Sequence, residues 1–400
     1  MRLSTILKRQ KDEQTNSRLR DVTESQSQVD TYYTLASQLD NALGSSDTSL
    51  SAAMQQFFSA AQDLSTNPSS ATFRQSLLSQ GNALATNFQV FSGQLNTMQS
   101  QVNSQLTDTV AQVNTLASQI ADLNAQISVY SNGTAAPSDL LDQRDQLLQQ
   151  LSQDVAVTTV TQSDGSLNVC SGYGQPLGAG GMAQSLTTVA NPYDPTRTEV
   201  AFQSGGSPVM ISNQLSGGTL GGLLQVRDDV LDPAQNALGR IAVSLASGFN
   251  TQHKLGTDLN GNAGKDFFTI GGPVANARSD NAGTATVTAS ITSPSALTSS
   301  DYRLTYDGSD AYTLTRLSDH QTFSIDTGGS YPYTTTAIDG MTLTISSGAA
   351  AGDSFQIEPT RQAAGSIGVA ITSTAEIAAA APIVADASAA NTGTGVITPG

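Results

Sequence analysis

The longest regular pattern in the chain is a stripe of apolar residues between Leu95 and Tyr130. Steps of three and four align side chains along one side of an α-helix, and the stripe consists of Leu95, Met98, Val102, Leu106, Val110, Val113, Leu116, Ile120, Leu123, Ile127 and Tyr130. From Val113 onward the steps alternate as in a coiled-coil seam. Such a helix is roughly 50 Å long, and so narrow a stripe needs partner helices to cover it. The pattern predicts a rod-like helical bundle.

Helical spacing recurs in other parts of the chain. It predicts long helices at about 8–43, 70–130, 139–153 and 219–253, with Gly44 placed to end the first. These segments carry apolar residues on one side. Each therefore has a face to bury against its neighbours. In the long stripe the other positions are Gln, Asn, Ser, Thr and Ala, with Asp108 and Asp122 as the only charges.

The breaks between these helices carry recognisable stop and start signals. A shorter helix at about 50–64 ends at Asn67-Pro68, and Ser69 or Ser70 can cap the helix that follows. Residues 131–137 read SNGTAAP and predict a turn. Because this connection is short, we expect the helices on either side to pack as antiparallel neighbours.

The last helical segment contains an internal break at Asp232-Pro233. Proline has no backbone N–H to donate and crowds the preceding turn, so it either kinks one helix or separates two. The apolar spacing after Leu231 complements the seam of the long stripe. We therefore expect residues 238–249 to pack against residues 113–130.

Strand-like patterns begin at Val155, where the apolar period changes from helical to alternating. Asp164-Gly165 lies between two alternating runs and predicts a β-hairpin, part of a small β element at 155–215. Alternating Thr-rich runs at 271–360 predict an all-β domain, barrel or sandwich, of five or six short strands. Residues 361–400 are rich in Ala and Gly and predict a partly flexible tail that returns to the rod.

The predicted fold class is therefore α+β multidomain. A helical rod domain at 1–270 carries the hairpin element, an all-β domain is inserted at 271–360, and the tail follows.

Composition excludes several classes of partner. The chain has 17 basic and 33 acidic residues and a formal net charge of −16, so it lacks the basic surface that nucleic acid requires. Its apolar runs are far shorter than the about 20 residues of a membrane span, and its first residues lack the features of a Sec signal. The single cysteine, Cys170, allows no intrachain disulfide and is interpreted as an ordinary strand residue.

One segment could be mistaken for an ion site. Asp258-Leu-Asn260-Gly-Asn262 resembles the start of an EF-hand loop, but Ala263 and Thr269 stand where that loop needs Gly and Glu. A turn stabilised by its own Asp and Asn side chains is the simpler interpretation.

Two further candidates also have simple interpretations. The glycine run Gly217–Gly222 lacks the Lys and Ser/Thr of a phosphate loop and predicts a flexible start to a helix. His253 and His320 have no ligand pattern around them and are interpreted as solvated or capping residues.

Several carboxylates on helices could in principle form an acid–base pair. They are interpreted instead as charges on the solvent-exposed face of a bundle, next to two arginines. The carboxylates are Asp142, Asp145, Asp228 and Asp229, and the arginines are Arg144 and Arg227. We accordingly predict no catalytic, cofactor-binding or metal-binding residue, no cofactor and no enzymatic activity.

Three stretches together resemble the family of flagellar hook-associated protein 1, the hook-filament junction proteins. They are DLLDQRDQLLQQLS at 139–152, NPYDPTRTEV at 191–200, and the long segment from GGTLGG to KDFF at 217–268. The resemblance covers most of residues 8–382. It implies a structural adaptor that forms a ring between the hook protein and the second, filament-side hook-associated protein. It also implies export to the outside of the cell by the flagellar type III system, without a Sec signal.

The chain departs from this family's pattern at both ends. The family's Asn-rich first segment and its long final heptad helix are not found, which predicts a monomeric core fragment without the terminal polymerisation regions. Chaperone binding, which the family assigns to the final region, is not expected. A secreted coiled-coil translocator or adhesin, with residues 284–358 as its β head, is the alternative function. A peptidoglycan hydrolase is a third, opposed by the lack of a convincing acid–base cluster.

The long helix also predicts how such an adaptor makes contacts. Its exposed positions include Gln112, Gln119 and Gln126, which are seven residues apart. Amide side chains can exchange polar contacts without breaking buried ion pairs. We expect this face to contact neighbouring subunits.

Overall fold

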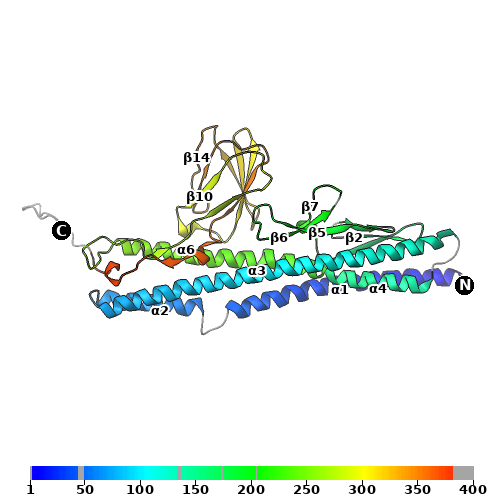
Figure 1. Cartoon of the computed structure of the whole chain (residues 1–400), viewed down its shortest axis with the longest axis horizontal. Coiled ribbons are helices and arrows are strands. Elements are labelled where there is room, and N and C mark those ends of the chain that lie inside the picture. Colours follow the sequence, from blue (N-terminus) through cyan, green and yellow to red (C-terminus); the bar gives the residue numbers. More distant parts are fainter. Residues whose placement is uncertain (1, 44–48, 133–136, 173, 204, 382–400) are drawn as a thin grey trace, which may run out of the picture. The chain divides into compact units, whose positions relative to one another are not determined.

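The computed structural model describes residues 2–43, 49–132, 137–172, 174–203 and 205–381 (Figure 1). The predicted helix end at Gly44, most of the turn at 131–137 and the tail beyond residue 381 lie outside these ranges. The chain divides into two compact units, of which the first comprises Met1–Asn41 and Asn96–Asp232. The second comprises Ala42–Leu95 and Pro233–Gly400.

The helices of the described ranges follow the apolar periods of the sequence. The α-helices are α1 (Arg2–Leu43), α2 (Leu50–Thr66), α3 (Ala71–Ser128), α4 (Ser138–Asp154), α5 (Gly218–Val226), α6 (Asp232–Lys254) and α7 (Ala363–Ser366). Short helical turns of other types are η2 (Val129–Asn132), η3 (Ser212–Gln214), η4 (Arg227–Leu231), η5 (Pro294–Ala296) and η6 (Thr374–Glu376).

The strands are short. They are β1 (Val157–Thr161), β2 (Leu167–Ser171), β3 (Gln175–Ala179), β4 (Met182–Ala183), β5 (Ser185–Ala190), β6 (Thr198–Gln203), β7 (Val209–Met210), β8 (Phe268–Thr269), β9 (Val274–Ala277), β10 (Val287–Ile291), β11 (Tyr302–Gly308), β12 (Ala311–Arg316), β13 (Thr322–Asp326), β14 (Tyr333–Thr334), β15 (Met341–Ile345), β16 (Ser354–Glu358) and β17 (Gly368–Val369). Long helices together with antiparallel sheets confirm the predicted α+β class.

Two of the predicted local signals are confirmed in detail. β1 and β2 pair antiparallel on either side of Asp164-Gly165, and Gly165 has the positive φ of +82° that such a turn requires. Ser70 caps α3, because its Oγ accepts a hydrogen bond from Phe73 N at 3.4 Å. At Asp232-Pro233 the helix continues through the π-helical turn η4, in which Asp232 N donates to Arg227 O. This wider turn lies directly before Pro233, whose ring would crowd a regular α-helical turn.

In the first unit the stripe of α3 is buried, and three asparagines on the same helix hold the strands. Asn114 Nδ2 donates to Leu186 O and Asn114 Oδ1 accepts from Leu186 N, both at 2.8 Å. Asn124 makes the same pair with Leu167, at 2.8 and 3.1 Å. Asn103 donates to Thr196 O at 2.8 Å and accepts from Thr198 N at 3.0 Å. The three asparagine amides therefore satisfy backbone groups at β2, at β5 and at the start of β6, as a neighbouring strand would.

The glycine run at the start of α5 is a close packing point, so the predicted flexible helix start is wrong. A Cβ on Gly218 would lie 2.3 Å from Asp154 C at the end of α4. A Cβ on Gly222 would lie 2.6 Å from Gln28 O and 2.8 Å from Thr31 Cβ on α1. Only glycine lets these backbones approach so closely.

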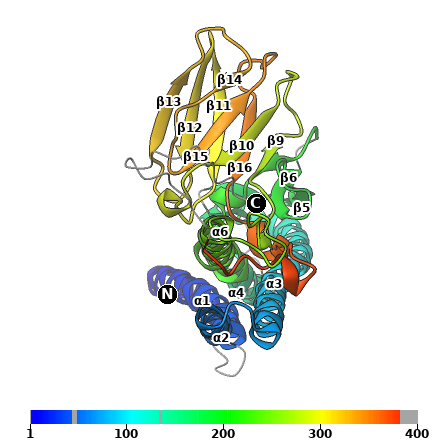
Figure 2. The ribbon, with the colours of Figure 1, turned by 90° about the vertical axis from the view of Figure 1, so that its left-hand side faces the viewer.

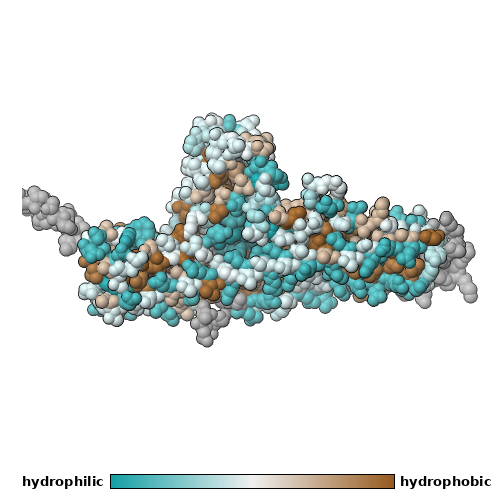
Figure 3. Space-filling model, viewed as in Figure 1, coloured by the Kyte–Doolittle hydropathy of each residue, from teal (hydrophilic) through white to brown (hydrophobic). Residues whose placement is uncertain are grey.

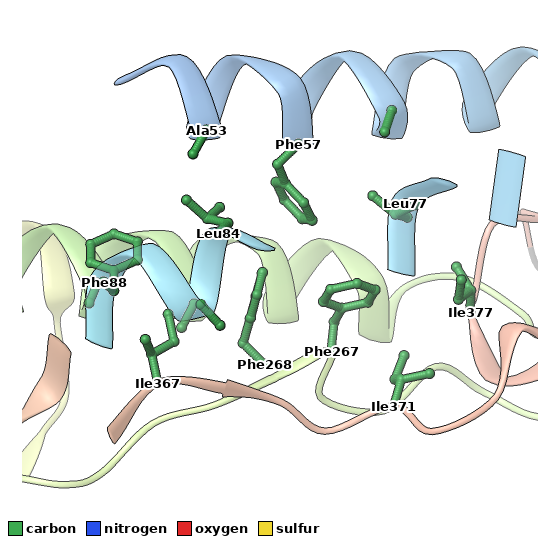
Figure 4. Packing of buried hydrophobic residues seen from close by; sticks show 14 of the residues in the cluster. Ala53, Phe57, Leu77, Leu84, Phe88, Phe267, Phe268, Ile367, Ile371 and Ile377 are labelled. Carbon is green, nitrogen blue, oxygen red and sulfur yellow. The ribbon is translucent and has the colours of Figure 1, made fainter. Parts of the chain in front are cut away.

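In the second unit an aromatic cluster joins α2, the first part of α3, α6 and the segment after α7 (Figure 4). Phe57 lies 5.8 Å from Phe267 and 5.3 Å from Phe268 between ring centroids. Gly81 of α3 makes room for Phe267, whose Cε1 would lie 2.8 Å from a Cβ there. Leu84 and Phe88 are fully buried in the same cluster.

The partner predicted for α6 is wrong. Leu238, Leu245 and Phe249 pack against the aromatic cluster of the second unit, whereas residues 113–130 belong to the first unit. The spacing of an apolar stripe identifies the buried face of a helix, but it does not distinguish between two partners of the same period. Phe267 and Phe268, which belong to no helical period, supply much of the surface that α6 covers.

The strands between β9 and β16 form two antiparallel sheets of the second unit (Figure 2). The strand orders are β13-β12-β11-β16-β9 and β10-β15-β14. Side chains from both sheets share one core that includes Leu304, Leu314, Leu343 and Phe355. At its base Arg361 pairs with Asp301, and Thr360 Oγ1 donates to Asn236 O of α6 at 3.0 Å.

The asparagine contacts can be tested by an amide-to-carboxylate exchange. Asn114→Asp removes the donor to Leu186 O and places a charge beside it, so we expect the unfolding free energy to fall by about 2 kcal/mol. Gln112→Glu is the matched control on the exposed side of α3, where the change should stay within about 0.5 kcal/mol. Urea unfolding of the chain measures both, and equal effects would contradict the assigned role of Asn114.

The glycine contacts give a second prediction. Gly222→Ala forces a methyl group against rigid backbone, and we expect a loss of about 1–3 kcal/mol. In the control, Gly93→Ala, the added methyl has no atom within 4 Å, so the higher helix propensity of Ala should stabilise α3 by about 0.5–1 kcal/mol. Thermal unfolding should therefore shift in opposite directions in the two variants, and a shift in the same direction would be inconsistent with this packing.

Candidate functional site

The segment that resembles a calcium loop is a turn held by its own side chains. Asp258 Oδ1 accepts hydrogen bonds from Asn260 N and Asn262 N, each at 2.8 Å. Asp258 Oδ2 accepts from the amide of Asn262 at 3.2 Å. The carboxylate is thus engaged with N–H donors of the turn, which confirms the simpler interpretation.

The two histidines differ, and the interpretation as solvated or capping residues is wrong for His253, which is buried and bonds two segments outside its own helix. His320 is exposed, in a turn with φ of +57°. His253 is only 5% exposed and both ring nitrogens are bonded, to Lys265 O at 2.5 Å and to Ala378 N at 2.8 Å. Cys170 is half-buried on β2, opposite Thr158 of β1.

Of the charged helix residues that the sequence predicts to be exposed to solvent, only some are exposed. Asp142, Asp228 and Asp229 are exposed, and Asp145 is half-buried and accepts from Asn16 Nδ2 at 3.0 Å. The two arginines are buried, however, which corrects the prediction for them. Arg144 donates to Asn124 Oδ1 at 3.1 Å and to Gly165 O at 2.9 Å, so it joins α4 to α3 and to the hairpin turn.

Arg227 belongs to the main buried charged cluster of the first unit. Its Nη2 lies 3.2 Å from Glu199 Oε2, and its Nη1 donates to Thr198 O at 2.8 Å. Arg197 lies in the same cluster, 2.7 Å from Asp232 and 3.0 Å from Asp228. Ser212 Oγ donates to Glu199 Oε2 at 2.5 Å. The cluster thus joins β6 to η3, η4 and the start of α6.

The pKa of Glu199 reflects this arrangement. Burial by itself raises it, but the Arg227 guanidinium, hydrogen bonds from Ser212 and Asn191, and the charge of Arg197 together hold the pKa below its ordinary value of 4.5. Glu199 is therefore a stable anion between two cations. Such a group fixes the position of its neighbours and is poorly suited to exchange protons in catalysis.

The charged cluster explains the structural roles of several polar residues in the NPYDPTRTEV stretch at 191–200. Asn191 Oδ1 accepts from Tyr193 N at 2.9 Å, and Asp194 Oδ1 accepts from Thr196 N at 2.9 Å, so the loop is closed by its own side chains. Arg197 and Glu199 then anchor the loop to η4. Sequence reasoning singled out this stretch but missed the pairing, because the ionic partners lie about thirty residues further along the chain.

A groove on the first unit is the best candidate for a binding surface. It lies between α3 and α4 and has a volume of about 390 Å³. Its lining consists of Gln119, Asp122, Leu123, Gln126, Gln143, Gln146, Leu147 and Gln150. All five glutamines are exposed, and Leu123 and Leu147 form a more buried apolar floor. The groove therefore offers uncharged amides with a single carboxylate. Figure 3 shows hydrophilic residues along much of the helical surface on the face it displays.

Other kinds of site have no support in the described ranges. No three His, Cys, Asp or Glu side chains there lie close enough together to hold a metal ion. Among the helices that the structure describes, none combines the length and hydrophobicity that crossing a membrane requires.

Neutralising Glu199 should reveal the contribution of the charged cluster. Glu199→Gln leaves Arg227 buried beside a neutral group, and we expect a loss of about 3 kcal/mol in urea unfolding at neutral pH. Because the pKa of Glu199 is lowered, its stabilisation is present above 4.5 and is lost as the pH falls below 4.5 toward the folded-state pKa. The difference between wild type and variant should therefore shrink in acid. Asp228→Asn, at a side chain that is 55% exposed, is the control and should change stability by less than about 1 kcal/mol.

Two protein-family descriptions match this chain, one over most of its helices and the other over the β strands that follow them. Residues 36–268 match the family described as "Flagellar hook-associated protein FlgK helical domain". Residues 274–359 match "Flagellar hook-associated protein 1, D2-like domain".

Individual relatives agree with these families. Flagellar hook-associated protein 1 of Salmonella typhimurium is 37% identical over 371 residues, which cover 91% of this chain and 66% of that protein. The Escherichia coli protein of the same name is 37% identical, with 87% and 64% covered. The chain thus spans slightly less than two thirds of the length of these relatives.

A solved structure also matches. The flagellar hook junction protein FlgK from Burkholderia pseudomallei is 39% identical and has a TM-score of 0.86, with 96% of this chain and 70% of that chain covered. The matched family regions, the sequence identity and the shared fold agree with one another. The chain therefore belongs to the family of the flagellar hook-associated protein FlgK.

Proposed function

We propose that this chain is a structural, non-catalytic part of the bacterial flagellum that joins the hook to the filament. Its membership of the FlgK family, whose solved relative is named a hook junction protein, is the observation that carries the proposal. The same observation favours this function over the translocator, adhesin and hydrolase alternatives. The main buried charged cluster is consistent with a structural role, because it pairs its carboxylates with arginines.

The proposed partners are the hook protein on one side, the filament-side hook-associated protein on the other, and further copies of the protein in a ring. The proposed location is outside the cell, after export by the flagellar type III system. The proposed domain division is a helical rod at 1–270, an all-β domain at 271–360 and a tail at 361–400.

The mechanism that we propose is mechanical. A junction between a flexible and a stiff polymer must resist bending yet allow its contacts to shift. Helices packed side by side resist bending, and α3 alone has 58 residues. Contacts through amides can shift with little loss of free energy, since one hydrogen bond replaces another and no buried charge loses its partner. Gln112, Gln119 and Gln126 are exposed along α3, and two of them line the groove beside α4.

Deletion of the gene tests the proposed role directly. We expect electron micrographs of the deletion strain to show hooks without filaments, with flagellin released into the medium. Complementation with the full-length gene should restore the filaments. Normal filaments on the deletion strain would overturn the proposed function.

Charge substitutions test the proposed contact surface. In the complementing gene, Gln112→Lys, Gln119→Lys and Gln126→Lys together should reduce swimming, because three cations desolvated at the contact would outnumber the two carboxylates on this part of α3, Asp108 and Asp122. The matched control introduces the same three charges on α2, at the exposed Gln55, Gln56 and Gln62. Equal swimming of the two variants, at equal protein levels, would rule out this face of α3 as the contact surface.

A further inference from the structure

The imidazole of His253 joins two chain segments of the second unit through a single neutral tautomer. Its Nδ1 lies 2.5 Å from Lys265 O, and its Nε2 lies 2.8 Å from Ala378 N. A carbonyl oxygen can only accept and a backbone N–H can only donate. The proton must therefore be on Nδ1, and Nε2 must keep its lone pair.

The segment on the Nε2 side, residues 371–380, is termed the strap here. It contains one short helical turn, η6, and is held largely by groups from elsewhere in the unit. Arg74 Nη1 donates to Thr374 O at 3.0 Å and to Ile377 O at 2.7 Å. Thr257 N donates to Ala380 O at 2.8 Å. Ile371 and Ile377 are buried in the aromatic cluster.

Of these attachments, only the one to His253 can change its hydrogen-bonding character near neutral pH. The guanidinium of Arg74 keeps its donors, and the backbone pair does not titrate. Protonation of the imidazole, in contrast, converts Nε2 from an acceptor into a donor that faces the Ala378 N–H. Two donors then oppose each other in a buried place, which costs far more than losing the hydrogen bond alone.

We propose that His253 is an acid-sensitive latch, which holds the strap while its imidazole is neutral and releases it on protonation. The strap then loses its hydrogen bond to α6 at Ala378, whereas the loop at 255–266 stays bonded to the ring through Lys265 O. The backbone bonds to Thr257, the Arg74 bonds and the buried apolar side chains remain, so the strap opens locally around Ala378.

The charges around the latch are mostly paired with each other. On α6, Lys254 pairs with Asp266 of the loop at 2.7 Å. Lys265 of the loop pairs with Glu376 of the strap, also at 2.7 Å. Arg74 of α3 and Asp258 of the loop also carry charge in this region, and the Asp258 carboxylate favours the charged form of Arg74. The side chains of Phe249 and Phe267 flank the ring itself.

These surroundings set the direction of the pH response. Burial lowers the pKa of His253 below its ordinary 6.5, and the Lys265 carbonyl and Asp266 oppose that shift only in part. Lys265 and backbone N–H groups hold the pKa of Glu376 below its ordinary value. A lowered histidine pKa means that the latch is complete above 6.5 and weakens as the pH falls below 6.5 toward the folded-state pKa. One proton couples to opening, so opening should increase by up to about tenfold per pH unit in that window.

Hydrogen–deuterium exchange on the whole chain tests the latch. We expect exchange of the strap amides, corrected for intrinsic rates, to rise about tenfold between about pH 7.5 and about pH 5.5 in the wild type. His253→Gln retains one donor and one acceptor but does not titrate, so its strap should lack this pH dependence. His320→Gln, which alters the other histidine of the chain, is the control and should behave like wild type. An equal pH response in wild type and His253→Gln would overturn the proposal, as would its absence in wild type.

A second measurement needs no substitution. Nitrogen NMR of the two histidines should show His253 as the Nδ1-protonated tautomer at neutral pH, with its protonation coinciding with the loss of the Ala378 amide's protection. His320 provides an internal reference in the same spectrum. An Nε2-protonated ring at neutral pH, or a protonated His253 beneath a fully protected strap, would show that His253 is not a latch.

Discussion

Short strands beside a helix leave backbone N–H and C=O groups that must find partners, and this constraint organises the first unit. Asn103, Asn114 and Asn124 meet it from α3. Each amide presents a donor and an acceptor side by side, which matches the edge of a strand. The apolar stripe of α3 supplies the free energy of burial, whereas the asparagines determine which segment of chain lies at which height along the helix.

Buried arginines play a related part in a chain with few charges. Arg74, Arg144 and Arg227 are each at most 7% exposed, and each donates to at least one backbone carbonyl. Arginine suits this role, since its planar group carries five donors and keeps its charge. Arg227 also pairs with a buried carboxylate, Glu199, at 3.2 Å. Arg74 donates to the carbonyl oxygens of Thr374 and Ile377, and Arg144 donates to those of Gly165 and the Asn124 side chain.

Much of the fold could be predicted from the spacing of apolar residues, because a helix or strand that buries one face has apolar residues at regular positions in the sequence. The Asp164-Gly165 hairpin and the Ser70 cap were predictable for the same reason, since each depends on neighbouring residues. The partner of α6 was not predictable, because Phe267 and Phe268 form part of it and lie outside any period.

The groove between α3 and α4 shows more clearly what cannot be predicted from the sequence. Gln119 and Asn124 are chemically similar, and nothing local indicates that one lines an open groove while the other is 1% exposed. The shorter asparagine side chain suits close approach to a strand, but that becomes evident only when the strand is seen. Arg197 and Arg227 likewise look like surface charges until their partners are known. Long-range pairing, rather than residue type, decided each of these cases.

The spacing of the three asparagines has a consequence for how this part of the protein can evolve. Positions 103, 114 and 124 are separated by eleven and ten residues, close to three helical turns each. Insertion or deletion of one residue between them would turn every later position by about 100° and direct the next amide away from its strand. We expect homologous chains to keep this length fixed, and to vary in length in the loops between strands.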